Sequence, residues 1–305
     1  MADLPAAPAR IPLGRSGLEV APLGWGMWRL AGADVAAARA RVDAALDAGC
    51  TLFDTADVYG LGTEGGFGAA EALLGRVLSQ APSLRRRMVL ATKAGIEPGV
   101  PYNSTAGYLV GACEASLHRL GVEQVDLLQV HRPDLLAHPE QVAKAFERLY
   151  RDGKIRAAGV SNYTVAQIRA LLRCLTMPLA SLQPEFSPLV LEPLTDGILD
   201  LALECGIAVL AWSPLAQGRL AGAGAGGDAR VARVIAALDA IAARAGVARS
   251  AVAYAWVMAH PARPVPLVGA QSPAHIREAA AARGVRLSRP EWYQVLEASR
   301  GERMP

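Results

Sequence analysis

Eight short apolar runs, each followed by an amphipathic stretch, constrain the fold of this chain most. The runs occupy 21–28, 51–55, 88–93, 125–131, 157–162, 179–183, 206–213 and 264–270. Most of them lack a strict apolar–polar alternation, which is typical of strands buried on both faces of a parallel sheet. Eight strand–helix units in 305 residues predict an α/β fold, a (β/α)8 TIM barrel in a single domain spanning 1–305.

The stretches between the runs have helical periodicity. The first begins at Asp34, a residue type that caps helices, and ends at Gly49, a residue type that stops them. The predicted helices occupy 34–49, 68–80, 104–121, 139–153, 164–174, 195–206, 229–246 and 272–284. A doubly wound open sheet is the competing architecture, but "GWGMW" at 24–28 lacks the Gly-rich fingerprint that usually follows its first strand.

Four segments fall outside the repeat. Residues 11–21 fit a hairpin around Gly14–Gly17, placed where it could plug the bottom of the barrel. The segments 248–261 and 289–301 predict an extra helix and a terminal helix. The Gly/Ala-rich stretch 221–229 predicts a mobile loop.

Composition excludes several classes of function. The formal charge is +3, without a basic stripe that carries aromatic residues, so nucleic acid is not an expected partner. No uninterrupted apolar run of ~18 residues predicts a membrane span, and the N-terminus has no apolar core of a signal peptide. A cytoplasmic protein without a metal site or disulfide framework is expected, because the four cysteines are far apart in sequence. They are Cys50, Cys113, Cys174 and Cys205.

Polar side chains recur at the ends of successive runs. They are Asp54, Lys93, His131, Ser161, Asn162, Gln183, Trp212 and Ser213. In a barrel the carboxyl ends of all strands share one rim, which holds the chemistry. One such residue could be structural, but six runs in succession that end this way predict a common pocket.

Tyr59 follows Asp54 by five residues and lies in the loop after the second run. A phenol has a pKa near 10 and is a weak acid at neutral pH, but a nearby ammonium lowers that pKa. We expect Lys93 to do this and Asp54 to keep the lysine charged and in position. The three residues therefore predict a general acid.

The motifs that carry these residues resemble the aldo-keto reductase family along nearly the whole chain. "LFDTADVYG", "LATKAG" and "DLLQVHRPD" resemble the family's catalytic segments, and "GKIRAAGVSNY", "LQPEFSPL" and "AWSPLAQG" resemble its cofactor segments. The resemblance implies an NAD(P)H-dependent oxidoreductase that transfers hydride from a reduced nicotinamide to an aldehyde or ketone. Tyr59 would protonate the carbonyl oxygen, Lys93 and Asp54 would tune Tyr59, and His131 would orient the carbonyl.

The resemblance also implies a cofactor site and a substrate site. The cofactor residues would be Gly26, Met27, Trp28, Asp54, Ser161, Asn162, Gln183, Trp212, Ser213, Pro214, Leu215, Gln217 and Gly218. Trp28, Tyr59, His131 and Tyr102 would contact a small carbonyl substrate. A monomer is the expectation from the family.

The segment 268–282 departs from the family pattern. Gly269, His275 and Ala279 stand where many relatives have a Lys and an Arg for the 2′-phosphate of NADP and an Asn for adenine. Gln271, Ser272 and Arg277 could replace part of this site. NADP(H) is the first expectation for the cofactor, and NAD(H) is the alternative.

Two other functions are compatible with the same barrel. A Schiff-base aldolase would use Lys93 as a nucleophile, but Asp54 favours a charged amine over a nucleophilic one. A slow, cofactor-sensing regulatory subunit would not need the complete set Asp54, Tyr59, Lys93 and His131. Both hypotheses rank below the reductase.

Overall fold

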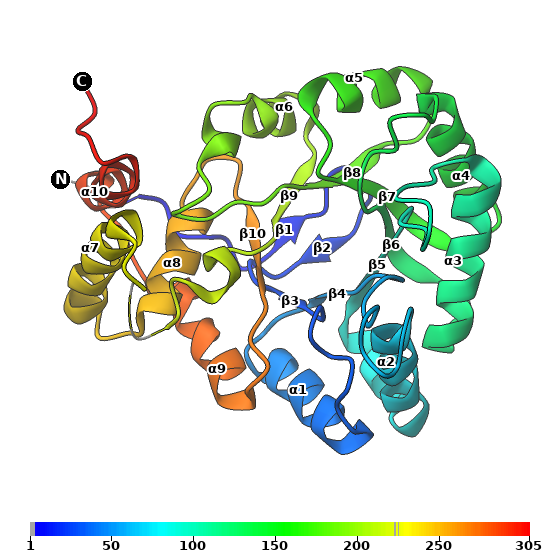
Figure 1. The fold of residues 1–305 in the computed structure, drawn as a ribbon, viewed down its shortest axis with the longest axis horizontal. Helices are drawn as coiled ribbons and strands as arrows, with labels where there is room; N and C mark the ends of the chain where they lie inside the picture. The colour runs from blue at the N-terminus through cyan, green and yellow to red at the C-terminus, as the bar shows by residue number, and fades with distance from the viewer. Residues whose placement is uncertain (1–3, 223, 225) are drawn as a thin grey trace.

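The computed structural model describes residues 4–222, 224 and 226–305. Within this part of the chain, eight parallel strands form a closed barrel, in which the last strand pairs with the first (Figure 1). The strands are β3 (Gly24–Gly26), β4 (Leu52–Asp54), β5 (Val89–Ala94), β6 (Val125–Val130), β7 (Ile155–Ser161), β8 (Leu179–Gln183), β9 (Ala208–Ala211) and β10 (Val265–Val268). The predicted TIM barrel is confirmed.

Helices surround the barrel close to their predicted positions. They are α1 (Val35–Asp47), α2 (Ala69–Gln80), α3 (Ala106–Leu120), α4 (Pro139–Arg151), α5 (Val165–Cys174), α6 (Ile198–Cys205), α7 (Ala229–Ala245) and α9 (Pro273–Glu278). The side chains of Asp34 and Thr105 cap α1 and α3, and Thr164 forms a capping box with Gln167 on α5. The predicted helix over 272–284 divides, because a 3-10 helix, η4 (Ala279–Gly284), follows α9.

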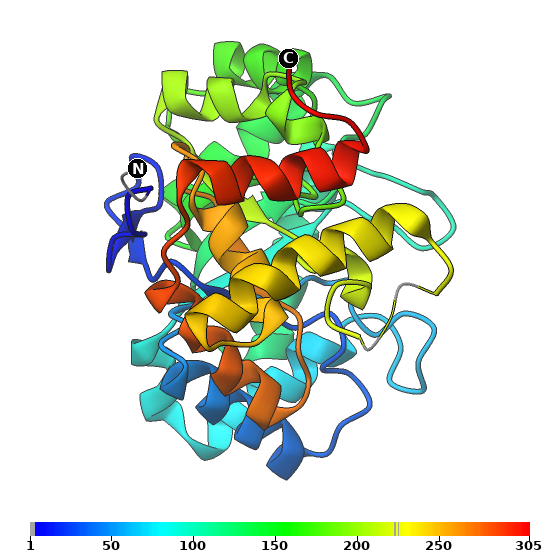
Figure 2. The same ribbon diagram turned by 90° about the vertical axis from the view of Figure 1, so that its left-hand side faces the viewer.

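The N-terminal hairpin closes one end of the barrel. Its strands β1 (Ile11–Pro12) and β2 (Glu19–Val20) pair antiparallel. Leu13 and Leu18 are buried in one cluster with Leu127 and Ala157 of the barrel strands, which excludes water from this end. In Figure 2 the hairpin lies on the left and the long loops of the other end extend to the right, so the barrel opens on the side of those loops.

Two helices are added to the repeat, α8 (Arg249–Met258) and α10 (Arg289–Arg300), as expected from the sequence. The Trp256 ring of α8 stacks on the Trp292 ring of α10 with their centroids 4.8 Å apart. Each indole N–H also donates to the main-chain oxygen of the other tryptophan at 3.0 Å. These contacts fix the two helices on each other.

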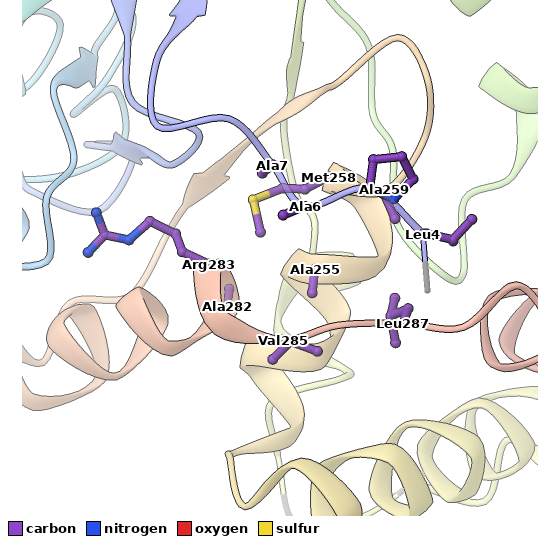
Figure 3. A pocket seen from close by; sticks show the side chains of 11 residues that line it. Leu4, Ala6, Ala7, Ala255, Met258, Ala259, Ala282, Arg283, Val285 and Leu287 are labelled. Atoms are coloured by element: carbon purple, nitrogen blue, oxygen red, sulfur yellow. The ribbon is translucent and has the colours of Figure 1, made fainter. Parts of the chain in front are cut away.

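The start of the chain lies across these additions. Residues 4–7 contact α8 and the segment 282–287 around a small apolar pocket (Figure 3). The Leu4 N–H donates to the Leu287 carbonyl at 2.8 Å. Residues 4–7 therefore lie beside both α8 and the segment that follows η4.

Two predictions about organisation stay predictions. Residues 223 and 225 of the expected mobile loop at 221–229 lie outside the described residues, and the assignment of 1–305 to one domain remains a prediction. In the part of the chain that the structure describes, no helix combines the length and the apolar character that a membrane crossing requires.

Candidate active site

Asp54, Tyr59, Lys93 and His131 meet at the open end of the barrel. Asp54 ends β4, Lys93 lies near the end of β5, and His131 follows β6 directly. The Lys93 ammonium donates to the Asp54 carboxylate and to the Thr55 carbonyl, the latter at 2.9 Å. Lys93 Nζ is 5.0 Å from the centroid of the Tyr59 ring, and the Tyr59 and His131 rings are 5.8 Å apart.

Main-chain hydrogen bonds explain how Tyr59 returns to the lysine. The Asp57 N–H donates to the Lys93 carbonyl at 3.0 Å, which continues the pairing with β5 beyond the end of β4. The Tyr59 N–H then donates to the Ala56 carbonyl at 3.1 Å and forms a turn. Strand β4 therefore delivers the carboxylate, and the loop that follows it delivers the phenol.

The Lys93 amine is charged at neutral pH. Burial on its own lowers the pKa of Lys93, but Asp54 and Tyr59 together outweigh burial and raise the pKa above its ordinary value. The other Asp54 oxygen accepts hydrogen bonds from Gln183 at 3.0 Å and Gln129 at 3.2 Å. The ion pair thus has the additional donors that a buried carboxylate needs.

The Tyr59 phenol differs from the expectation in one respect. Burial raises its pKa above the ordinary value, and Lys93 offsets this increase only in part. Lys93 lowers the Tyr59 pKa, as expected from the sequence, but the larger effect of burial, which the sequence did not indicate, raises that pKa overall. The phenol keeps its proton at neutral pH, as a proton donor must before the reaction.

The His131 imidazole is neutral in this environment. Burial holds the pKa of His131 well below its usual range, and the positive charges of Lys93 and Arg132 lower it further. His131 Nδ1 is buried and has no hydrogen-bond partner within the described residues. A neutral imidazole beside a phenol can donate a hydrogen bond to a carbonyl oxygen without adding a charge.

A cleft of about 1150 Å³ opens beside these residues. This volume lies just above the range of about 300–1,000 Å³ for small-molecule sites and suits a dinucleotide together with a small substrate. Besides Asp54, Tyr59 and His131, the predicted residues in its wall are Gly26, Trp28, Ser161, Asn162, Gln183, Trp212, Ser213, Pro214, Leu215, Gln217, Gly218, Gly269, Gln271, Ser272 and His275.

Four predicted residues do not reach the wall of the cleft, and one of them is Lys93, which is buried beside Asp54 and Tyr59. Met27 is fully buried, and its N–H donates to the Asp54 carbonyl at 2.9 Å. Arg277 projects away and forms an ion pair with Asp47 of α1 at 3.1 Å. Tyr102 lies in the loop after β5 and is not among the residues of the cleft wall. The main chain of Met27 therefore joins the end of β3 to β4, and Arg277 contributes to the contact between α9 and α1.

The polar residues at the ends of β7 to β9 are bonded to one another. The Ser161 hydroxyl donates to the Gln183 carbonyl at 2.9 Å, and the Trp212 indole donates to the Asn162 side-chain oxygen at 3.0 Å. Asn162 and Ser213 have positive φ angles of 59° and 53°, which are costly for residues other than glycine. Such backbone strain is often found at functional sites.

Sequence reasoning missed two groups of residues. Gln129 and Ser181 form the layer below the mouth, where the Ser181 hydroxyl donates to the Gln129 side chain at 3.2 Å. Gln129 could have been found, because it lies two residues before His131 on the same strand face. The missed residues of the cleft wall are Arg29, Arg132, Ala221, Gly222, Asp239, Ala248, Arg249, Ser250, Tyr254, Leu267, Ala270 and Glu278. Several of them lie on α8, whose sequence indicates only packing.

Potential metal ligands do not gather in the part of the chain that the structure describes. Within residues 4–222, 224 and 226–305, no group of three or more His, Cys, Asp or Glu side chains is arranged to hold a metal ion. The four cysteines are free thiols, and burial raises the pKa of Cys50 and of Cys113 to about 12. A thiol with so high a pKa is a poor nucleophile at neutral pH.

Comparison with known proteins agrees with this geometry. The family model described as "Aldo/keto reductase family" matches residues 22–300. A 6-dehydroglucose reductase of Novosphingobium aromaticivorans is 52% identical over 307 residues, covering 100% of both chains. A 6-dehydroglucose reductase of Agrobacterium fabrum is 36% identical and covers 93% of this chain and 96% of the relative.

A solved structure supports the fold. The thermostable aldo-keto reductase Tm1743, crystallised with the inhibitor epalrestat, superposes with a TM-score of 0.81. The match covers 95% of this chain and 99% of that one at 24% sequence identity, so it supports the architecture alone. With the family match over residues 22–300 and the full-length relatives, the chain belongs to the aldo/keto reductase family.

Proposed function

We propose that this protein reduces the aldehyde of an oxidised six-carbon sugar, of the 6-dehydroglucose type, to the alcohol with NADP(H). The observation that carries the proposal is the buried Lys93, which bonds to Asp54 and lies against the Tyr59 ring beside a cleft large enough for a dinucleotide. The substrate class rests on the two relatives that are named 6-dehydroglucose reductases.

The nicotinamide, when bound, supplies the hydride that reduces the carbonyl carbon. Tyr59 donates its phenolic proton to the carbonyl oxygen as negative charge develops there. The Lys93 ammonium then stabilises the phenolate that Tyr59 becomes, and Asp54 keeps Lys93 charged throughout. His131 donates a hydrogen bond to the same oxygen and orients it.

The mouth of the cleft is suited to a sugar. The Trp28 side chain is 63% exposed, and its ring meets the Tyr59 ring edge to face with centroids 5.1 Å apart. Arg29 and Arg132 also contribute to the wall. An exposed indole can cover the C–H face of a sugar ring, while guanidinium groups donate hydrogen bonds to its hydroxyls.

The alternative functions receive less support. A Schiff-base mechanism needs a neutral amine, whereas Asp54 and Tyr59 raise the pKa of Lys93 against the opposing effect of burial. A regulatory subunit with slow turnover would not need a proton donor, a charged lysine and a neutral imidazole at one mouth.

The test is the oxidation of NADPH, followed by absorbance, with 6-dehydroglucose and with a plain aldehyde such as butanal. We expect turnover of both substrates, with a higher kcat/KM for the sugar. Tyr59→Phe should lower kcat by about 100-fold or more, since general acid catalysis contributes 10²–10⁴-fold. Its NADPH affinity should be nearly unchanged. Full activity of Tyr59→Phe would overturn the role of Tyr59, and equal kcat/KM for the two aldehydes would overturn the sugar assignment.

A further inference from the structure

One row of residues crosses four neighbouring strands inside the barrel, close to its mouth. The backbone register pairs Lys93 of β5 with Gln129 of β6. It then pairs Gln129 with Gly159 of β7, and Gly159 with Ser181 of β8. Because side chains alternate between the two faces of a strand, residues paired in this way share one face of the sheet. The row therefore holds an ammonium, an amide, a gap and a hydroxyl, in that order.

The gap at Gly159 lets the amide and the hydroxyl meet. A Cβ atom at Gly159 would overlap the Ser181 Oγ atom and would lie 3.1 Å from Gln129 Cγ. With the gap open, the Ser181 hydroxyl donates to the Gln129 side-chain oxygen at 3.2 Å. Gln129 and Ser181 are both fully buried, so bulk water cannot replace this hydrogen bond.

The charge of Asp54 sets the direction of two amides. The Asp54 oxygen that does not bind Lys93 accepts from Gln183 at 3.0 Å and from Gln129 at 3.2 Å. A carboxylate can only accept hydrogen bonds, so each amide turns its nitrogen toward Asp54 and its oxygen away. The Gln129 oxygen is therefore left to accept from Ser181 and Gln183.

The plane of the Gln183 amide depends on Gln129. A single hydrogen bond to Asp54 would leave this amide free to turn about that bond. The Gln183 nitrogen makes a second bond, to the Gln129 oxygen at 3.4 Å, so both of its N–H groups are engaged. Within the described residues no donor bonds to the Gln183 side-chain oxygen, and Gln183 lies in the wall of the cleft. That oxygen is available to a ligand as an acceptor.

We propose that Gln129 is a positioning residue, which fixes the amide plane of Gln183 so that the Gln183 oxygen accepts a hydrogen bond from an N–H group of the bound cofactor. The inference rests on the proposed use of a nicotinamide cofactor, whose carboxamide supplies such an N–H group. Gln129 is not among the residues of the cleft wall, so it acts through Gln183. Asp54 and Ser181 hold Gln129 from its two sides.

The first experiment compares two cofactors that differ at the carboxamide. NADPH and its reduced 3-acetylpyridine analogue, whose acetyl group has no N–H, are titrated into the wild type and Gln129→Leu. Quenching of tryptophan fluorescence reports binding, because Trp28 and Trp212 line the cleft. We expect Gln129→Leu to raise the Kd for NADPH about 3- to 10-fold, the fold-change of one neutral hydrogen bond. The Kd for the analogue should change less than about twofold.

Leu127 provides the matched control. It lies two residues before Gln129 on the same face of β6 and is fully buried in the cluster under the hairpin. Leu127→Val removes one methylene group from that cluster. It should lower the Tm without changing the Kd of either cofactor.

Gln129→Glu tests the direction of the hydrogen bonds with little change in the shape of the side chain. When the introduced carboxyl group is protonated, its O–H can donate to Asp54 and its other oxygen can accept from Ser181 and Gln183. When ionised, it has no donor and repels Asp54. Burial and Asp54 raise the pKa of the introduced group and Lys93 opposes them, whereas the facing residues of β7 and β8 do not titrate. We expect the ratio of variant to wild-type Kd for NADPH to be near 1 at pH 6 and to rise about 3- to 10-fold toward pH 9.

The proposal is overturned if Gln129→Leu, folded as judged by its Tm, binds NADPH as the wild type does, or if it weakens NADPH and the analogue equally. A Kd ratio for Gln129→Glu that does not depend on pH would also overturn it. Its failure can be told apart from failure of the proposed function. Turnover of an aldehyde with saturating NADPH would leave the reductase intact even if Gln129 had no effect on binding. A wild type that does not bind NADPH would instead overturn the proposed function itself.

Discussion

Two buried carboxyl groups, Asp54 and Asp57, lie three residues apart and have opposite surroundings. Asp54 bonds to the Lys93 ammonium and accepts from the side chains of Gln129 and Gln183. Asp57 is fully buried, and neither of its carboxyl oxygens has a hydrogen-bond partner within the described residues. Burial, followed by the negative charge of Glu71, raises the pKa of Asp57 well above its ordinary value.

The region behind Asp57 explains the difference. Glu71 of α2 is fully buried, bonds to the Thr92 hydroxyl, and forms an ion pair with Arg119 of α3 at 2.7 Å. The positive charge of Arg119 is therefore directed to Glu71, and it lowers the pKa of Asp57 only in part. Burial therefore raises the pKa of a carboxyl group whose surroundings do not compensate for the lost water, as at Asp57.

The largest expected change in the free energy of unfolding follows from replacing Lys93, the cation that pairs with Asp54. Lys93→Met leaves the Asp54 carboxylate buried and unpaired, so we expect a loss of about 3–5 kcal/mol in the free energy of unfolding, measured in urea. The double variant Asp54→Asn/Lys93→Met should recover part of the loss. As a control, Lys144→Met breaks the exposed pair with Glu140 and should cost at most about 1 kcal/mol. Equal losses for Lys93→Met and Lys144→Met would contradict the comparison.

A smaller change in the free energy of unfolding is expected when Glu71 is replaced. Glu71→Gln removes the charge that Arg119 and Thr92 bind, which should lower the free energy of unfolding by about 1.5–3 kcal/mol, the range for a hydrogen bond to a charged group. It should also lower the pKa of Asp57, because Glu71 is the second cause of its increase. Denaturation of the variant at several pH values measures both changes. An unaltered pH dependence would show that Glu71 does not act on Asp57.

The third prediction is a gain in stability. The pKa of Asp57 is higher in the folded than in the unfolded protein. The contribution of Asp57 to the free energy of unfolding is therefore fully present below the unfolded pKa, and it is lost as the pH rises through the folded pKa. Asp57→Asn removes this loss. The variant should therefore be more stable than the wild type at pH 8, with a smaller difference at pH 4, as measured by Tm. A variant less stable than the wild type at pH 8 would indicate that Asp57 is charged and bound.

The smallest expected change is in the pKa of His131. Burial, then Lys93 and Arg132, lower its pKa, so the imidazole should stay neutral from pH 8 to pH 6. Arg132→Gln removes the weakest of these three causes and should raise the pKa slightly, as measured by NMR titration of the imidazole protons. Arg148→Gln, on the exposed side of α4, is the control and should leave it unchanged. A His131 that titrates near pH 6.5 in the wild type would contradict a neutral imidazole.

The sequence predicted those features that depend on chain order. Strand ends place Asp54, Lys93 and His131 on one rim, because parallel strands have a fixed direction, and the turn at residues 56–59 is local. The sequence did not predict features that depend on tertiary packing. The raised pKa of Tyr59 follows from burial by distant residues, and the contribution of Arg249 follows from the packing of an added helix on the cleft.

The closure of the barrel has a consequence for biosynthesis. Strand β3 pairs with β4 on one side and with β10 on the other, where Gly24 lies opposite Leu267. The ribosome must therefore add more than two hundred residues after β3 before its second edge can be covered. Because β10 also pairs with β9, a chain without β10 leaves two strand edges uncovered, and an uncovered edge can recruit another nascent chain. We expect chains that terminate before β10 to aggregate during synthesis, whereas chains that lack only the residues after α10 should still close.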